Sequence, residues 1–228
     1  RIKVSKSFPI FNQLNYFIVT VFLTWKIARE FKPELIHGNI GYPGGFWSWC
    51  MSKVLHKPFV ITEHTRITNN FRSSFHQLLT IFPLKRASKL VAVSKLQADE
   101  IFSYIGKQPI VIPNIIDFEK FRDISENKNL VCQIGFLGSL HANTKGLDIL
   151  LRAVAGIKNE FILHVGGGGP LLDEYKVMAR QLGVDHKCVF HGFVSPDQVP
   201  TFMKQLHFFV SASRYESFGI VMVEAMAC

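Results

Sequence analysis

The chain has 228 residues, of which 48% are hydrophobic and 19% charged, so it can bury a sizeable core and is not an intrinsically disordered chain. Its four cysteines are far apart and form no Cys-x-x-Cys pair, which excludes a disulfide-stapled miniprotein and a zinc ribbon and suits a reducing compartment. The formal net charge is +9: residues 1–118 hold 15 Lys and Arg against 6 Asp and Glu, whereas residues 119–228 hold 11 of each. A basic half joined to a neutral half indicates one surface that faces an anionic partner, such as a membrane or a phosphorylated lipid.

The first predicted element lies between Ser7 and Trp25, a stretch without formal charge that is rich in large apolar residues. A membrane-spanning helix needs about 20 mostly apolar residues. Asn, Gln and Thr side chains interrupt this stretch, and charged residues follow from Lys26. We therefore expect a well-buried helix of the first domain here and not a membrane span.

From Phe31 onward, short apolar runs alternate with stretches of helical periodicity. In this half, strands are predicted at residues 34–37, 58–62, 90–93 and 110–112, and helices at residues 46–54, 71–82 and 95–105. Within the second of these helices one apolar face is predicted, made of Phe71, Phe75, Leu78, Leu79 and Phe82. Ser94 is expected to cap the third helix.

A polar, highly charged stretch follows, and we predict a domain linker at residues 119–129. The second half then repeats the alternation, with strands at residues 130–137, 161–165, 189–190 and 208–212 and helices at residues 147–154, 171–182 and 196–206. Such alternation implies parallel sheets joined by crossover helices. The sequence therefore predicts an α/β protein with two Rossmann-like domains, at residues 1–118 and 130–228, and a cleft between them.

The strongest functional signal lies at residues 215–226, where a helix that begins near Gly219 follows a buried strand. Open α/β sheets bind ligands at the carboxyl ends of their strands, and the free N–H groups of a starting helix favour a phosphate or a sugar oxygen. Glu216 precedes the helix and Glu224 lies about one and a half turns inside it, so both can face a polyhydroxylated ligand. The spacing alone equally allows Glu216 to be a helix cap and Glu224 a solvated residue.

Glu216 and Glu224, eight positions apart, resemble the E-x7-E signature of the family 4 retaining glycosyltransferases (glycosyl transferases group 1), which have the GT-B fold. Further motifs of that family follow one another over nearly the whole chain. They are His37 with Tyr42-Pro43-Gly44-Gly45, Thr62-Glu63-His64, Ala92-Val93-Ser94, Ile112-Pro113-Asn114-Ile115-Ile116-Asp117, Gly135-Phe136-Leu137-Gly138 with Lys145-Gly146-Leu147-Asp148, and Val165-Gly166-Gly167-Gly168-Gly169-Pro170. The resemblance implies two Rossmann-like domains with parallel sheets facing across a cleft, the first on the acceptor side and the second binding a nucleotide sugar.

The resemblance also implies roles for the residues of the last motif. Glu224 would hold the ribose hydroxyls of the nucleotide sugar, and Glu216 would hold the transferred sugar. The backbone amides of Ser217, Phe218 and Gly219 would contact that sugar or the diphosphate. The donor would be a UDP- or GDP-linked sugar, and neither a cofactor nor a metal is expected.

By the same resemblance, Gly138 and Lys145 complete the donor site. Lys145 would neutralise the diphosphate as it leaves, a task that a fixed cation performs without a metal. The alternative for Lys145 is a solvated residue at a helix N-terminus, a position where the helix dipole disfavours a cation. That dipole favours a role directed at the ligand.

His64 closes a buried strand, at the place where the resemblance puts a first-domain histidine of the active site. It would contact the donor sugar and orient the reaction without being a nucleophile, which makes His64, Glu216 and Lys145 the expected catalytic residues. The alternative is a structural histidine, since the chain has nine. Glu63 is either the partner of His64 or an ordinary loop carboxylate.

The chain departs from the family pattern in two places. Ser139 stands where the family has an arginine that shares the diphosphate with the lysine, and Arg214 is a candidate to replace that arginine. The glycine-rich loop that the family carries early in its first domain would lie before Arg1. Because the chain also ends at Cys228 within a helix-like apolar run, we expect a fragment truncated at both ends.

Competing motifs fit poorly. A G-x-G-x-x-G frame at Gly166 lacks its last glycine, no P-loop sequence is present, and no Cys/His spacing predicts zinc. The nearest match to an Asp-x-Asp metal motif is Asp117-Phe118-Glu119, at the start of the predicted linker.

We therefore predict a retaining, metal-independent hexosyltransferase that moves a sugar from a nucleotide-diphosphate donor to a saccharide or lipid-linked acceptor in cell-surface glycan biosynthesis, as for lipopolysaccharide or exopolysaccharide. The alternatives are another GT-B enzyme (a glycosyl phosphorylase or a nucleotide-sugar epimerase) and a non-catalytic nucleotide-binding fragment. The basic first half fits peripheral contact with an anionic membrane, hence a cytoplasmic protein at the inner membrane face. Nucleic acid is not an expected partner, because the second half is neutral and no basic-aromatic stripe appears.

Overall fold

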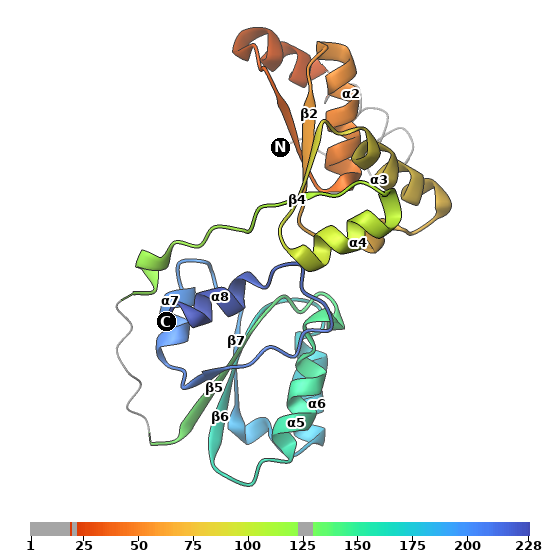
Figure 1. Ribbon diagram of the computed structural model, residues 1–228. Coiled ribbons are helices and arrows are strands. Elements are labelled where there is room, and N and C mark those ends of the chain that lie inside the picture. The colour runs from red at the N-terminus through yellow and green to blue at the C-terminus, as the bar shows by residue number, and fades with distance from the viewer. Residues whose placement is uncertain (1–18, 20–21, 123–129) are drawn as a thin grey trace. The chain divides into compact units, whose positions relative to one another are not determined.

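The computed structural model describes residues 19, 22–122 and 130–228, and the chain divides into two compact units, Arg1–Pro113 and Asn114–Cys228 (Figure 1). Among the described residues each unit contains one four-stranded sheet. All paired strands in both sheets run parallel, and helices connect them. The predicted α/β class with two Rossmann-like halves is confirmed.

The first unit has the strand order β1-β2-β3-β4. Its strands are β1 (Ile36–Asn39), β2 (Phe59–Glu63), β3 (Lys89–Ala92) and β4 (Ile110–Val111), and its helices are α2 (Phe46–Leu55), α3 (Ser74–Arg86) and α4 (Lys95–Ile105). A tight turn, Gly41–Gly45, in which Tyr42 has an extended backbone conformation, connects β1 to α2. The strands and helices predicted from Phe31 onward in this half are confirmed, with shifts of a few residues at their ends.

The core of the first unit lies between the sheet and its helices. Alternate residues of β2 point into it, and Ile61 is completely buried. Helix α4 packs through Ala98, Ile101 and Ile105, whose spacing of three and four residues puts them on one face. Ser94 caps α4 as predicted, because its Oγ accepts a hydrogen bond from the amide of Gln97 at 3.2 Å.

Helix α3 buries a different face from the one predicted. Phe75 and Leu78 are 64% and 58% exposed, whereas Thr80, Pro83 and Leu84 are buried. The close approach of α3 to the turn Gly41–Gly45 explains the difference, because a Cβ on Gly41 would lie only 3.0 Å from the Thr80 methyl group. Leu84 Cδ1 lies 3.3 Å from the same Cβ position, so the helix presents Thr80 and Leu84 to this turn, and not Phe75 and Leu78.

The predicted N-terminal helix lies mostly outside the described residues, and its described part differs from the expectation. Residues 22–31 are helical, but Phe22 and Leu23 are 58% and 46% exposed, and among residues 22–31 only Ala28 is buried. Apolar residues occur all around this helix and form no single stripe, so a run of them does not define a buried face. Within the described chain, no helix combines the length and the apolar character needed to cross a membrane.

The second unit has the strand order β7-β6-β5-β8. Its strands are β5 (Cys132–Leu137), β6 (Phe161–Gly166), β7 (Cys188–Gly192) and β8 (Phe208–Phe209), and its helices are α5 (Leu147–Ala155), α6 (Leu172–Gln181), α7 (Val199–Lys204) and α8 (Ile220–Met226). Because β5 pairs with both β6 and β8, β6 and β7 extend the sheet on one side of β5 and β8 extends it on the other, so the strand order reverses at β5. Ligands of such sheets bind outside the carboxyl ends of the strands at this reversal.

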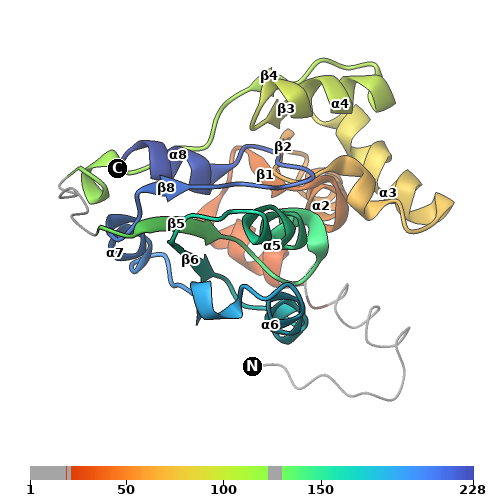
Figure 2. The same cartoon turned by 90° about the horizontal axis from the view of Figure 1, so that it is seen from below.

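Two apolar layers cover the sheet of the second unit. Helices α5 and α6 pack on one layer, and the predicted stripe of α5 is confirmed, since Leu147, Leu150, Leu151 and Val154 are all buried. Helices α7 and α8 join the other layer, which is built around Phe202. Figure 1 shows α7 and α8 on one side of β5 and α5 and α6 on the other, and Figure 2 gives the same elements after a rotation of 90°. The sheet is therefore buried on both faces, as parallel sheets usually are.

The division between the units falls slightly before the predicted boundary at residue 118. Residues 118–120 form a 3-10 helix, and Phe121 is buried with the α7 layer of the second unit. Residues 123–129 of the predicted linker lie outside the described residues. The four cysteines, Cys50, Cys132, Cys188 and Cys228, all lie in the described part of the chain and are free thiols.

Candidate active site

A small cavity of about 140 Å³ lies at the carboxyl ends of β5 and β8 in the second unit. Its lining includes a group of glycine and polar residues from three separate segments. These are Gly138, Ser139, Lys145, Ser213, Glu216 and Gly219. The structure thereby brings together Gly138, Lys145, Glu216 and Gly219, which the sequence predicts as donor-site residues.

Lys145 and Glu216 form an ion pair in the wall of this cavity. Lys145 Nζ donates to Glu216 Oε1 at 2.7 Å, and Ser213 Oγ donates to the same oxygen at 2.8 Å. The two charged side chains are 32% and 25% exposed, so both are partly withdrawn from water and still reachable. Within the described part of the chain no hydrogen bond is found for Glu216 Oε2, which leaves this oxygen to accept one from a ligand.

Two loops carry this pair, and they approach each other closely. Gly146, which ends the turn containing Lys145, has φ of 71°, and a Cβ there would overlap the carbonyl oxygen of Ala212. The amide of Arg214 donates to the carbonyl oxygen of Thr144 at 2.8 Å. A glycine is therefore required at residue 146 both for its backbone conformation and for the contact with the loop of Glu216.

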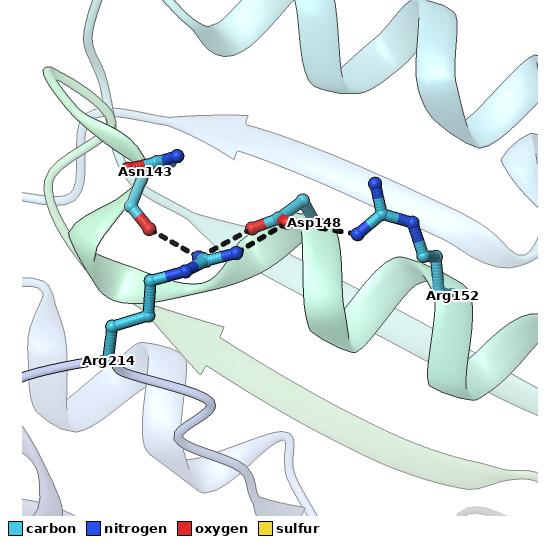
Figure 3. A network of polar contacts seen from close by, with 4 residues as sticks. All are labelled: Asn143, Asp148, Arg152 and Arg214. Atoms are coloured by element: carbon cyan, nitrogen blue, oxygen red, sulfur yellow. Dashed lines mark hydrogen bonds and ion pairs between the residues drawn. The ribbon is translucent and has the colours of Figure 1, made fainter.

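The side chain of Arg214 ties the same two loops together (Figure 3). Its guanidinium donates to both carboxylate oxygens of Asp148 at 2.8 Å and to the carbonyl oxygen of Asn143 at 2.6 Å. Asp148 also accepts from Arg152 at 3.1 Å. Hydrogen bonds from Arg214, supported by its charge and by Arg152, lower the pKa of Asp148 to about 2.

This arrangement bears on the missing arginine of the family pattern. Arg214 does not line the cavity, and its guanidinium is engaged by Asp148 and Asn143, so the suggestion that it replaces an arginine at Ser139 is not supported. Ser139 does line the cavity, and its hydroxyl pairs with Nδ1 of His141 at 3.0 Å. Arg214 instead fixes the loop that carries Glu216.

The other predicted donor residues, Ser217, Phe218 and Glu224, are not part of the cavity lining. Ser217 and Phe218 occupy the loop between Glu216 and Gly219 and are half-buried. Gly219 has φ of 78° and precedes helix α8, as predicted. Glu224 lies within α8, and burial raises the pKa of its carboxyl above the ordinary value. Their proposed contacts to a nucleotide sugar stay predictions.

His64 belongs to the first unit, where it follows the carboxyl end of β2. Its Nε2 pairs with Asn39 Oδ1 at 3.1 Å, and Asn39 is the last residue of the neighbouring strand β1. The residue is exposed. Glu63, immediately before it, is completely buried and its carboxylate accepts from the backbone amide of His64 at 3.1 Å, so Glu63 contacts the main chain of His64 and not its ring.

Sequence reasoning missed Ser213, Asp148 and Asn39 as contributors to these sites. Ser213 and Asp148 lie within or beside motifs that the sequence identifies, yet only the fold brings them to Glu216 and Arg214. Over the described ranges there is no group of three or more His, Cys, Asp or Glu side chains that could hold a metal ion.

Models of two families match the chain in succession. Residues 1–120 match Glycosyltransferase Family 4, and residues 117–228 match Glycosyl transferases group 1. The two matches meet close to the division between the structural units.

Curated relatives and solved structures agree with these matches. The chain is 26% identical to an uncharacterized glycosyltransferase of Methanocaldococcus jannaschii, over 96% of this chain and 60% of the relative. It is 26% identical to the alpha-monoglucosyldiacylglycerol synthase of Streptococcus pneumoniae, over 89% of this chain and 52% of that protein. The chain thus spans little more than half the length of these relatives.

The crystal structure of HepE from Anabaena, in complex with UDP and glucose, resembles this chain with a TM-score of 0.77 and 22% identity, over 91% of this chain and 60% of that one. This likeness shows a shared fold, the GT-B fold that the sequence motifs imply. Because one family model covers more than half of the residues and the second continues to the end, the chain belongs to Glycosyltransferase Family 4.

Proposed function

We propose that the complete protein is a retaining glycosyltransferase that takes a sugar from a nucleotide-diphosphate donor and transfers it to a saccharide or lipid-linked acceptor. The observation that carries this proposal is the Lys145–Glu216 pair in the wall of the cavity at the end of β5. It presents a cation and a carboxylate side by side, which suits a ligand that joins a diphosphate to a polyhydroxylated sugar.

In the proposed reaction the bond from the anomeric carbon of the sugar to the diphosphate oxygen breaks, and that oxygen keeps the electron pair. A new bond forms from the anomeric carbon to the acceptor oxygen, and the proton of the acceptor hydroxyl goes to the departing diphosphate oxygen. Negative charge grows on the departing diphosphate, and Lys145 stabilises it. Glu216 accepts hydrogen bonds from the sugar hydroxyls through the oxygen that Lys145 and Ser213 leave available.

The other predicted residues take the parts that the family resemblance gives them. Glu224 holds the ribose, and the amides of Ser217, Phe218 and Gly219 hold the sugar or the diphosphate. His64 contributes from the first unit by contacting the donor sugar. No metal is assigned to this reaction, because Lys145 supplies the fixed positive charge.

The acceptor is proposed to be a saccharide or a lipid-linked molecule at the inner face of the cell membrane, with the protein bound peripherally. Two observations support this. The surplus of basic residues is confined to residues 1–118, which suits an anionic surface, and the relative from Streptococcus pneumoniae is named for a glucosylated diacylglycerol. HepE binds UDP and glucose, which supports a UDP-linked donor for this chain.

A thermal-shift panel followed by product analysis tests the proposal on the complete protein. UDP, GDP and ADP, free and as their sugars, are all added at one common concentration, and a ligand present at about a hundred times its dissociation constant raises the melting temperature by several degrees. We expect a shift with one nucleotide only, abolished in Glu224→Ala. Nuclear magnetic resonance of the product then gives the configuration at the anomeric carbon, which must equal that of the donor.

Matched variants separate the site from its surroundings. Glu216→Gln and Lys145→Ala remove the two cavity charges, and Glu160→Gln and Lys158→Ala remove exposed charges of the same unit. Loss of transfer in the first pair with activity kept in the second supports the site. A sugar phosphate formed from added inorganic phosphate would indicate a phosphorylase, and a sugar with a changed ring configuration formed without an acceptor would indicate an epimerase. A nucleotide shift without turnover would indicate a binding protein.

A further inference from the structure

Glu63 is a carboxylate that the core of the first unit buries completely. Glutamate is rarely found in such a place unless it is paired, because removing its charge from water is strongly unfavourable. Glu63 is the last residue of β2, the strand that lies between β1 and β3. A buried carboxylate at the end of a central strand needs hydrogen-bond donors around it to be stable.

Four donors surround the carboxylate, and all of them come from the chain near the two loops that follow β1 and β2. Oε2 accepts from the amide of Gly41 at 2.7 Å. Oε1 accepts from the amide of His64 at 3.1 Å and from both the amide and the hydroxyl of Thr65 at 3.0 Å each. Because every partner donates, the ionised form, which only accepts, fits this environment.

The two carboxylate oxygens therefore serve two different loops. Oε1 holds the loop that carries His64, and Oε2 holds Gly41, the first residue of the turn Gly41–Gly45. The residue before Gly41 is Ile40, which has φ of 61° and ψ of 150°. A β-branched residue with positive φ is strained, and such strain persists only where the surrounding contacts hold it.

A second buried side chain also holds the loop of His64. Gln97, also completely buried, donates from Nε2 to the carbonyl oxygen of Thr65 at 2.9 Å and accepts at Oε1 from the amide of Val93 at 2.9 Å. The ring of His64 is left with Asn39 Oδ1 as its partner, at 3.1 Å. The main chain at His64 is thus fixed by buried groups while its side chain is exposed.

We propose that Glu63 is a positioning residue for the transfer reaction: its carboxylate joins the His64 loop to the turn Gly41–Gly45 and so sets where the exposed imidazole lies. This inference rests on the proposed function and on the active-site role of His64. Glu63 itself cannot touch a substrate, since none of its surface is accessible. A displacement of about 1 Å at a group that orients the reaction can cost on the order of a hundredfold in rate.

The variant Glu63→Gln tests this link selectively. Its amide oxygen satisfies the three donors of His64 and Thr65, so its NH2 group must face the amide of Gly41, where a donor meets a donor. The contact to Gly41 is then lost while the volume is kept. On the complete protein we expect kcat to fall by about 10- to 100-fold, with the dissociation constant for the donor nucleotide unchanged, because the donor cavity belongs to the other unit.

A double-mutant cycle with His64→Ala distinguishes positioning from a general loss of structure. If Glu63 acts through His64, kcat of the double variant equals that of His64→Ala alone, because the two changes are not additive. Thr65→Val removes only the hydroxyl donor and is expected to give a smaller loss, again absent in the His64→Ala background. Glu34→Gln, an exposed glutamate of the same unit, serves as the control for charge.

The outcomes separate the inference from the proposed function. If the wild-type protein transfers no sugar, the proposed function fails. If the wild type is active and Glu63→Gln matches it, or if its loss adds to that of His64→Ala, the positioning role is overturned. If Glu63→Gln does not fold, the Thr65→Val pair of measurements decides: a loss that persists without His64 overturns the inference, and one that vanishes supports it.

Discussion

Lys145 Nζ lies 2.7 Å from Glu216 Oε1, although 71 positions separate the two residues in the chain. One comes from the turn after β5 and the other from the loop after β8. The pairing of β5 with β8 brings these segments to one end of the sheet. The site thus follows from the strand order of the sheet. Separate contacts fix each of its loops, and single substitutions can remove them one at a time.

Replacing Lys145 by methionine removes the cavity cation and keeps most of the side-chain volume. The ion pair is partly exposed, so we expect the free energy of unfolding to change by no more than about 1 kcal/mol. Turnover at saturating donor is expected to fall by about 10²- to 10³-fold, because charge on the leaving diphosphate is no longer stabilised. Urea unfolding and steady-state kinetics measure the two effects. Lys158→Met is the control, and wild-type turnover in Lys145→Met would rule out the assigned role.

Replacing Arg214 by lysine removes the two-point contact with Asp148, since an ammonium group cannot reproduce the guanidinium geometry. Asp148 has a lowered pKa in the folded protein, so its contribution to stability is present above its ordinary value of 3.8 and is lost as the pH falls toward 2. In Arg214→Lys we expect the pKa of Asp148 to rise toward 3.8. A carboxyl titration followed by nuclear magnetic resonance measures this directly, and an unchanged titration would contradict the contact.

Replacing Gly146 by alanine is expected to disrupt the junction of the two site loops. A Cβ at residue 146 overlaps the carbonyl oxygen of Ala212, and the positive φ adds strain. The strain costs about 1–2 kcal/mol and the overlap about 1–3 kcal/mol more. Gly183→Ala is a matched control, because Gly183 has φ of 68° but open space around its Cβ position. Equal losses of unfolding free energy in both variants would show that the contact with Ala212 carries no energy.

The pair His164 and His191 predicts a pH dependence of stability in the second unit. Their ring nitrogens lie 2.9 Å apart, and burial lowers the pKa of both below the ordinary value of 6.5, with the charge of His191 adding to the effect on His164. The unfolded chain therefore binds more protons than the folded one below about pH 6.5, so stability falls as the pH drops through that region.

Melting temperatures at pH 7.5 and pH 5.5 check this expectation. His164→Gln is expected to reduce the difference between the two, because one of the two titrating groups is gone. His186→Gln, which removes an exposed histidine outside the pair, is expected to keep it. A difference that His164→Gln leaves intact would assign the pH dependence to other groups.

Local sequence patterns predicted much of the fold. The stripe of α5 and the Ser94 cap are properties of a few neighbouring residues, and spacing reveals them. The buried face of α3 could not be found in this way, because it depends on how closely Gly41 approaches Thr80. The turn that makes this contact lies more than thirty residues earlier in the chain. The spacing of apolar residues within the helix therefore cannot predict which face the turn covers.

In the candidate site, too, the sequence predicted some features and not others. The resemblance carried by Glu216 and Lys145 predicted seven donor-site residues, and the structure brings four of them, Gly138, Lys145, Glu216 and Gly219, into the lining of one cavity. It did not predict that Arg214 is engaged by Asp148, since an arginine beside a motif can face either a ligand or a neighbouring loop. The hydrogen-bond partners of long charged side chains depend on the tertiary structure, so the spacing of residues in the sequence seldom predicts them.

The strand order of the second unit has a consequence for how the protein is made. During synthesis β5, β6 and β7, together with α5 and α6, leave the ribosome before β8 and can pair and bury their shared layer. Lys145 is then already in place, but its partner Glu216 is not yet available. Contacts between distant positions form late because the loop must close first. A nascent chain therefore acquires the charge pair of its cavity only after β8 has joined β5, and ligand affinity would report that the whole unit has been completed.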